Sequence, residues 1–345
     1  MPDPIPTKPT IHKQPLFWPS SDGPSECYPA IGSGTAAREY LNREGFIVLR
    51  NAVPYSLCTA AKAAFNTEVK PDRSYFLRHE SGKYEQHVFT EANFMKYPIM
   101  NVQDLSEKKF PRFRRLGLDI VTQPAIQRAV KVLLGETGRV IHTMYFDGNQ
   151  VTWPHRDAHY IDSERSGEMI AVWIALEDIH PDAGRFYVCP RSHRTKIPGV
   201  VDENSLDPNG PGYKSLIADY VNNGPLECVA PQLKQGDAIF WSALTIHGSL
   251  PTLNPRYSRR SFTAHYIGAS DEFRWNYAKT KRTERATRTG KPESIIVNGV
   301  SIALHEDQSD WRRQLKLTMA ARLPGAYTLL RTAKSAWQHS GRANR

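Results

Sequence analysis

Before Arg139, three segments of the chain have apolar residues at the spacing of a helix face. This period is clearest from Gln123 to Leu134, where the apolar positions form one stripe. Gly45 ends an earlier helical stretch, and the β-branched run after it has the composition of a strand. Helices are therefore predicted over Ala36 to Arg43, over Ser56 to Val69 with Ser56 as N-cap, and over Gln123 to Leu134, with a strand from Phe46 to Arg50.

From Arg139 onward the pattern changes to short apolar runs separated by Gly-, Pro- and Asp-rich turns. The runs cover Val140 to Phe146, Met169 to Leu176, Phe186 to Cys189, Ala238 to Trp241 and Ser261 to Ile267. Regularly spaced short strands favour a β-sandwich or jelly roll. The predicted fold class is mainly β, with the flanking helices packed on one sheet.

Turn residues and charge divide the chain into three predicted parts. Residues 1–33 are rich in Pro, Ser and Gly and are expected to form an irregular N-terminal arm. Residues 34–268 hold the periodic segments and form the main domain. Residues 269–345 form a basic, partly helical C-terminal extension, with helices predicted from Asp310 to Ala321 and from Tyr327 to Trp337.

Composition places the chain among globular proteins, with 40% hydrophobic and 23% charged residues. Its apolar stretches are far shorter than the roughly 20 residues that span a bilayer. The N-terminus has no apolar core of the signal-peptide type, so a cytoplasmic location is expected. The four cysteines contain no C-x-x-C pair and are most simply free, semi-buried thiols.

The net charge of +10 is concentrated near the C-terminus. Residues 271–345 contain fifteen Lys or Arg and seven Asp or Glu, a balance of +8. Such a surface favours an acidic small molecule, an anionic membrane or nucleic acid, and a solvated surface without a partner fits equally well. The apolar residues that alternate with this charge favour a C-terminal helix that packs on the barrel, and peripheral contact with an anionic membrane is the alternative; they are Trp311, Leu315, Leu317, Met319 and Leu323.

Residues 70–112 are aromatic and polar with weak periodicity, which is typical of loops around a pocket. Basic side chains in this region could meet an acidic substrate: Arg73, Arg78, Lys83 and His87.

Two histidines and an aspartate have the spacing of a metal site. His155 and Asp157 are two residues apart, so on a strand both side chains point to the same face. His247 follows the predicted strand Ala238 to Trp241 and would supply a third ligand from a distant part of the chain. Two imidazoles and one carboxylate are the facial ligand set of mononuclear non-haem iron(II), which keeps positions open for O2 and a co-substrate. His155, Asp157 and His247 are therefore predicted to bind iron and to be catalytic.

A basic residue past the second histidine would suit an anionic co-substrate. Alternation along the predicted strand puts Arg259 on the same face as His265, whereas Arg260 faces away. A planar guanidinium can bind a carboxylate through two parallel hydrogen bonds. Alternation alone leaves the choice between Arg259 and Arg260 open.

Further segments extend this pattern over roughly residues 36–268. They are Gly45-Phe46-Ile47-Val48-Leu49, His155-Arg156-Asp157, Trp173-Ile174-Ala175-Leu176-Glu177-Asp178, Gly184, Pro190-Arg191-Ser192-His193, His247-Gly248-Ser249 and Arg259-Arg260-Ser261. In these segments the chain resembles the phytanoyl-CoA dioxygenase family of iron(II)- and 2-oxoglutarate-dependent oxygenases.

The resemblance implies a double-stranded β-helix that holds Fe(2+) through His155, Asp157 and His247. It also implies that Arg259 binds the distal carboxylate of 2-oxoglutarate with help from the Ser249 hydroxyl, and that Trp173 lines this pocket. In relatives the arginine commonly lies one position earlier, where this chain has Ser258. A loop longer by one residue brings Arg259 into register with the following strand. Family members that halogenate lack the carboxylate ligand, so the presence of Asp157 disfavours halogenation.

The predicted activity is that of a dioxygenase that hydroxylates a C–H bond of a small anionic or zwitterionic molecule, consumes O2 and 2-oxoglutarate, and releases succinate and CO2. Nucleic acid is not expected as a partner, because repair oxygenases carry an Arg-x-Asn-x-Thr-x-Arg run that Asn254 to Arg259 does not match. Other readings are a non-catalytic cupin-like binding protein, a zinc hydrolase with the same ligands, and an oxygenase acting on a membrane-associated lipid or glycolipid. No pattern in the chain indicates an oligomeric state.

Overall fold

The structure, a computed structural model, describes residues 35–78, 83–149, 152–197, 211–278, 285–305, 308 and 310–323. The predicted N-terminal arm and the predicted helix from Tyr327 to Trp337 lie outside the described residues.

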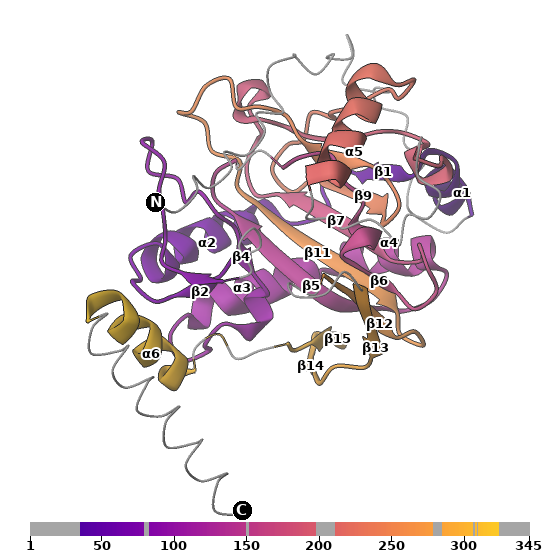
Figure 1. The fold of residues 1–345 in the computed structure, drawn as a ribbon. Coiled ribbons are helices and arrows are strands. Elements are labelled where there is room, and N and C mark those ends of the chain that lie inside the picture. The colour runs from indigo at the N-terminus through magenta and orange to yellow at the C-terminus, as the bar shows by residue number, and fades with distance from the viewer. Residues whose placement is uncertain are drawn as a thin grey trace, which may run out of the picture.

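The described part contains six α-helices and fifteen strands (Figure 1). The helices are α1 (Ala36–Glu44), α2 (Tyr55–Ala64), α3 (Pro111–Val121), α4 (Pro124–Leu134), α5 (Pro211–Asn223) and α6 (Trp311–Arg322). The strands are β1 (Phe46–Leu49), β2 (Phe76–Leu77), β3 (Tyr84–Glu85), β4 (Ile99–Met100), β5 (Gly138–Phe146), β6 (Ile161–Ser163), β7 (Ile170–Ala175), β8 (Phe186–Val188), β9 (Ala238–Ser242), β10 (His247–Ser249), β11 (Ser261–Gly268), β12 (Phe273–Ala278), β13 (Arg285–Gly290), β14 (Ser294–Val297) and β15 (Val300–Ala303).

One large sheet forms the centre of the molecule, with the strand order β1-β9-β7-β11-β5-β15-β14 and β4 beside β5. Figure 1 shows β5, β11, β7, β9 and β1 as neighbouring arrows across the molecule. A smaller sheet of β10 and β8 carries two further backbone bridges, His155 with His247 and Val188 with Val229. Two sheets with helices covering one of them form a jelly roll, as the sequence predicts.

Strand β7 shows why the central strands read as continuous apolar runs. Val172 and Ile174 belong to the apolar cluster that includes helix residues such as Phe65 and Phe113. Trp173 between them belongs to a second cluster, together with Phe186 of β8. Alternate side chains are therefore buried on both faces, against the helices and against the small sheet. The site residues lie on the face toward the small sheet.

Most predicted elements form, but the predicted N-cap is wrong. Helix α2 already begins at Tyr55, and Pro54 occupies the cap position with a ψ of 139°. Because the fixed φ of proline suits a helix start, the cap lies two residues before the predicted Ser56. The predicted stretch to Val69 continues as a π-helical turn over Phe65–Val69.

Helices α3 and α5 were not predicted from the sequence. In α3, Gly117 sits in the helix interior, where glycine weakens the helical signal. The glycine allows close packing, since a Cβ there would lie 2.9 Å from the Cζ atom of Phe262 on β11. Packing against β11 thus explains why this helix contains a glycine, although glycine has a low helix propensity.

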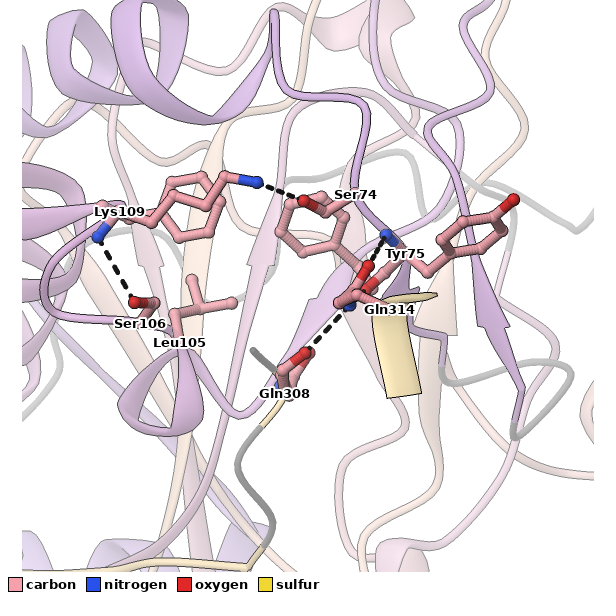
Figure 2. A pocket seen from close by; sticks show the side chains of 9 residues that line it. Ser74, Tyr75, Leu105, Ser106, Lys109, Gln308 and Gln314 are labelled. Atoms are coloured by element: carbon pink, nitrogen blue, oxygen red, sulfur yellow. Dashed lines mark hydrogen bonds between the residues drawn. The ribbon is translucent and has the colours of Figure 1, made fainter. Parts of the chain in front are cut away.

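Residues of the predicted C-terminal extension add to the sheets and form α6. Strand β12 pairs with β6, and β15 pairs with β5. Helix α6 confirms the helix predicted from Asp310, whose side chain accepts a hydrogen bond from the backbone N–H of Arg312. The Gln314 amide exchanges two hydrogen bonds with the backbone of Tyr75, at 2.8 and 2.9 Å. Figure 2 shows the two residues beside each other, with a dashed line between the Tyr75 backbone nitrogen and the Gln314 side chain. Among the described residues, no helix combines the length and apolar character needed to cross a membrane.

The turn at Gly236 provides a test of the fold. Its φ of +87° is strained for any other residue, and an added Cβ would lie 2.4 Å from the carbonyl oxygen of Val53. Gly236→Ala should lower the free energy of unfolding by roughly 3 kcal/mol or more, through backbone strain plus a clash with rigid backbone.

Two glycines offer matched controls. Gly299→Ala has a similar φ of +79° in open space, so we expect a loss of only about 1 kcal/mol. Gly290→Ala meets neither a positive φ nor a neighbouring atom, so its effect should be close to zero. Denaturant unfolding curves measure all three, and equal losses for Gly236→Ala and Gly299→Ala would contradict the proposed clash.

Candidate metal centre

A backbone bridge joins the two predicted histidine ligands. The N–H of His155 donates to the carbonyl of His247 at 3.0 Å, and the N–H of His247 donates back at 3.1 Å. The two imidazole rings lie side by side, with centroids 4.3 Å apart. Residues 92 positions apart in sequence are thereby held as direct neighbours across a narrow antiparallel pair.

Asp157 completes the cluster at the start of a short 3₁₀ turn, Asp157–His159. Its Oδ1 atom lies 3.5 Å from the Nε2 atom of His155 and 3.4 Å from that of His247. All three candidate ligand atoms are within 4.8 Å of one another, and the three residues are buried. Metal–ligand bonds of about 2.1 Å at right angles separate neighbouring ligand atoms by about 3 Å, so this spacing suits one cation.

Hydrogen bonds to the backbone orient both imidazoles. The Nδ1 atom of His155 lies 2.9 Å from the carbonyl oxygen of Trp153, and the Nδ1 atom of His247 lies 2.9 Å from that of Thr245. A carbonyl can only accept, so each Nδ1 carries the proton and donates. The Nε2 lone pairs then face Asp157, as metal ligation requires.

The second carboxylate oxygen of Asp157 is occupied by neighbouring side chains. The indole N–H of Trp241 donates to Oδ2 at 2.8 Å, and the Nε2 atom of His265 lies 3.4 Å from the same oxygen. Oδ1 is therefore the atom left for a cation. Strand alternation predicted that His265 shares a face with Arg259, but the part played by Trp241 was missed, because no spacing rule reveals where an indole N–H points.

Burial and charge favour the forms that bind a cation. Burial by itself would raise the pKa of Asp157, but the proximity of the His247, His155 and His265 imidazoles outweighs it and holds this pKa well below its usual range. Burial, followed by the proximity of His247, lowers the pKa of His155. At neutral pH the aspartate is thus an anion and His155 is neutral, which are the protonation states of metal ligands.

Arg259 is a buried cation on the inner side of the sheet, with only 1% of its surface exposed. Its guanidinium lies over the rings of Phe146 and Trp173 and donates to the carbonyl of Gly184 at 3.3 Å. No carboxylate among the described residues forms an ion pair with it, and its Nε has no hydrogen-bond partner. Burial lowers its pKa to about 9, so it remains charged at neutral pH.

Arg260 faces a different environment. Its Nε donates to Asp147 at 2.8 Å, so its charge is already neutralised. Ser258, at the position where relatives commonly have the arginine, donates its hydroxyl to Glu177 at 2.6 Å. Of these three neighbours, only Arg259 offers an unneutralised buried charge.

Of the two other predicted co-substrate residues, Trp173 contacts Arg259, and Ser249 lies on β10 beside the metal-site histidine His247. Ser249 follows His247 by two residues on β10, and its hydroxyl oxygen accepts the N–H of Thr152 at 2.7 Å. Trp173 lies against the Arg259 guanidinium, and its indole N–H is buried without a partner. Phe186, which the sequence did not single out, contacts both His247 and Trp173, with ring centroids 5.5 and 6.0 Å away. It connects the triad to the surroundings of Arg259.

Two of the four basic residues named in the aromatic region, Arg78 and His87, are engaged within the protein. Arg78 is buried, donates to the carbonyls of Tyr97 and Pro98, and lies 2.8 Å from a ring nitrogen of His87. It therefore supports the loop rather than meeting a substrate. The pocket in Figure 2, lined by Tyr75, Phe110, Gln314 and their neighbours, contains none of the predicted site residues.

Comparisons with known proteins agree with this geometry. The peroxisomal phytanoyl-CoA dioxygenase of Mus musculus is 25% identical over 286 residues, which cover 77% of this chain and 79% of that protein. Phytanoyl-CoA dioxygenase domain-containing protein 1 of Bos taurus is 30% identical over 138 residues, which cover 38% of this chain and 45% of that protein.

Solved structures show the same fold. The non-heme alpha ketoglutarate dependent carbocyclase SnoK from nogalamycin biosynthesis has a TM-score of 0.51 at 17% identity, over 69% of this chain and 85% of that one. EctD from S. alaskensis, with 2-oxoglutarate and 5-hydroxyectoine, has a TM-score of 0.50 at 20% identity, over 79% of this chain and 86% of that one.

The family assignment rests on the match to a whole family. The family described as phytanoyl-CoA dioxygenase (PhyH) matches residues 41–261, well over half of the 345 residues and the full span from before β1 to the start of β11. The ligand cluster and the buried arginine both lie within it. The chain belongs to the phytanoyl-CoA dioxygenase family, and its enzyme class is that of the non-haem iron(II)- and 2-oxoglutarate-dependent dioxygenases.

Proposed function

We propose that the chain binds Fe(2+) through His155, Asp157 and His247, binds 2-oxoglutarate through Arg259, and hydroxylates a C–H bond of a small anionic or zwitterionic molecule. The observation that carries the proposal is the Asp157 Oδ1 atom, which faces the Nε2 atoms of both histidines at 3.4–3.5 Å. Three ligand atoms on one side of a cation leave the other side for co-substrate and O2.

The donor set fits iron(II). Two neutral imidazoles and one carboxylate are characteristic of iron oxygenases with open positions, and each ligand is oriented by a further hydrogen bond. Asp157 occupies the ligand position that a halide takes in family members that halogenate, which supports hydroxylation over halogenation.

Arg259 supports the assignment of 2-oxoglutarate. A buried guanidinium without an acidic partner is costly unless an anion joins it, and its fork matches the two oxygens of a carboxylate. Trp173 would form a flat wall beside the co-substrate, and the Ser249 hydroxyl would donate to the same carboxylate while its oxygen continues to accept from Thr152.

Held by His155, Asp157 and His247, iron would supply the chemistry that couples the oxidative decarboxylation of 2-oxoglutarate, to succinate and CO2, with the transfer of one oxygen atom from O2 to the substrate. The chain's residues fix geometry and exclude water. Trp241 and His265 keep Oδ2 of Asp157 turned away, and Phe186 covers His247. A dry site limits side reactions of the oxidant.

An anionic substrate is supported by a cation next to the ligands. The ammonium of Lys214 on α5 lies 3.7 Å from the centre of the Trp153 ring, and that ring is 6.4 Å from the His155 ring. Both side chains are half-buried, so the ammonium adds positive charge to the surroundings of His155.

The proposal also includes a cellular location and a membrane contact. A cytoplasmic location is supported by the three described cysteines, which are free thiols. Peripheral contact with an anionic membrane, and with a lipid or glycolipid substrate there, is supported by the exposed Trp311, Leu315 and Leu323 of the basic α6 segment. Cosedimentation with phosphatidylserine vesicles, compared with phosphatidylcholine vesicles, tests the membrane contact.

Succinate release tests the reaction class. Purified protein with Fe(2+), O2 and 2-oxoglutarate should form succinate slowly, and faster when a candidate anionic metabolite is added. His155→Ala should lose this turnover by at least about 10³-fold, because a ligand is missing. His159→Gln alters a neighbouring histidine that contacts Tyr213 and should keep most of the activity. Equal succinate release by wild type and His155→Ala would refute the proposal, and a non-catalytic binding protein would release none.

Two buried tryptophans test the orientation of Asp157. Trp241→Phe removes the N–H that holds Oδ2, so the affinity for Fe(2+) should fall about 10–100-fold. Trp173→Phe removes an N–H that has no partner and should leave metal affinity within about twofold. Equilibrium dialysis without 2-oxoglutarate measures both, and similar affinities for the two variants would contradict the role of Trp241.

Arg259 is tested through the co-substrate. Arg259→Gln should raise the KM for 2-oxoglutarate about 10²-fold, the scale of two charge-assisted hydrogen bonds, and Arg259→Lys should recover only part of it because the fork is lost. Arg260→Gln is the matched control, since that side chain is occupied by Asp147. A larger KM effect in Arg260→Gln than in Arg259→Gln would reverse the assignment.

A further inference from the structure

Two cysteines that are 39 residues apart in sequence lie against each other in the fold. The Sγ atoms of Cys189 and Cys228 are 3.3 Å apart. Cys189 is fully buried, whereas Cys228 is half-buried and so open to small solutes. The sequence predicts free thiols without predicting this pairing.

The backbone around the two cysteines already has the geometry of a cross-strand disulfide. Val188 and Val229 exchange both backbone hydrogen bonds, at 2.9 and 2.8 Å. In an antiparallel pair the next two residues, Cys189 and Cys228, are then directly opposed, with Cα atoms about 4.5 Å apart. A disulfide accepts Cα separations of about 4.4–6.8 Å, so the two sulfurs can bond without displacing the strands.

The surroundings favour a disulfide over a metal site. Cys189 belongs to an apolar cluster with Tyr213 and Ile217 of α5, and Cys228 packs against that cluster. Val188, the residue before Cys189, belongs instead to the cluster around Trp173 and Trp241. Among the described residues no further His, Cys, Asp or Glu joins the two thiols to make a metal-binding group.

We propose that Cys189 and Cys228 form a reversible disulfide when hydrogen peroxide reaches the enzyme. The more exposed Cys228 thiolate attacks one peroxide oxygen, the O–O bond breaks, and hydroxide leaves, which gives a sulfenic acid at Cys228. The Cys189 sulfur then attacks the sulfur of Cys228, gives up its proton and displaces the hydroxyl group as water. In total the two thiols lose two electrons and two protons, and one peroxide becomes two molecules of water.

The Cys189–Cys228 disulfide would join two points of the chain that lie before and after α5 in sequence. In that helix the Tyr213 hydroxyl contacts the ring of His159 and accepts the backbone N–H of Arg156, next to the ligands His155 and Asp157. The two sulfurs lie on the other side of β8 from the triad, so oxidation leaves the metal ligands in place. The oxidised protein should therefore unfold at a temperature several degrees higher and still bind Fe(2+).

Peptide mapping tests the proposal on the wild-type protein. After one equivalent of hydrogen peroxide and quenching, two of the four thiols should be lost. Tryptic digestion should then join the peptide of residues 186–191 to the peptide of residues 215–234, with a mass two hydrogens below their sum. Dithiothreitol should release both peptides.

Variants separate this pair from general oxidation. Cys189→Ser should accumulate a sulfenic acid at Cys228 that dimedone traps, because no second thiol is present to displace water. Cys58→Ser, which removes a buried thiol in α2, should cross-link as wild type does. A sulfinic acid at Cys228 without any cross-linked peptide in wild type, or cross-links that involve Cys27 or Cys58 instead, would overturn the proposal.

Discussion

The narrow backbone pair between residues 155 and 247 is the constraint on which the site depends. It sets two imidazoles side by side, and the carbonyls two residues before each histidine accept from Nδ1, so both Nε2 atoms are aimed at one point. Asp157 can meet them only because the chain turns directly after the bridge. The two sheets of the jelly roll hold this pair in position, since His155 and His247 come from segments that are far apart in sequence.

Burial also determines which ligands the charged residues of this region can bind. Asp157, in the turn after the backbone bridge, and Arg259, just before β11, are both buried, and the apolar cluster that includes Phe186, Trp173 and Trp241 lies beside them. Charged groups in such a place are stable only when partners neutralise them. Asp157 and Arg259 have opposite signs but occupy separate places, so each calls for a ligand of its own, a cation for the aspartate and an anion for the arginine. This separation of opposite charges supports the proposal that one site holds both iron and a dicarboxylate.

Local chemistry and alternation made much of this predictable from sequence. His155, Asp157 and His247 were identifiable because ligand type and an i, i+2 spacing at a strand end are both local signals. The choice between Arg259 and Arg260 depends on strand register, which the sequence leaves open. In the structure Arg259 is buried without an acidic partner, whereas Arg260 is paired with Asp147. The indole N–H of Trp241 and the proximity of Cys189 to Cys228 depend on tertiary packing between distant segments. Helix α3 was missed because Gly117 serves packing against Phe262 at the expense of local helix propensity.

We propose that His155, Asp157 and His247 together form one iron site. Anaerobic equilibrium dialysis with Fe(2+) tests this without depending on a substrate. We expect one iron per wild-type chain and a large loss of affinity in Asp157→Ala and in His247→Ala, with both variants folded as judged by their unfolding curves. Unchanged iron binding in either folded variant would contradict it.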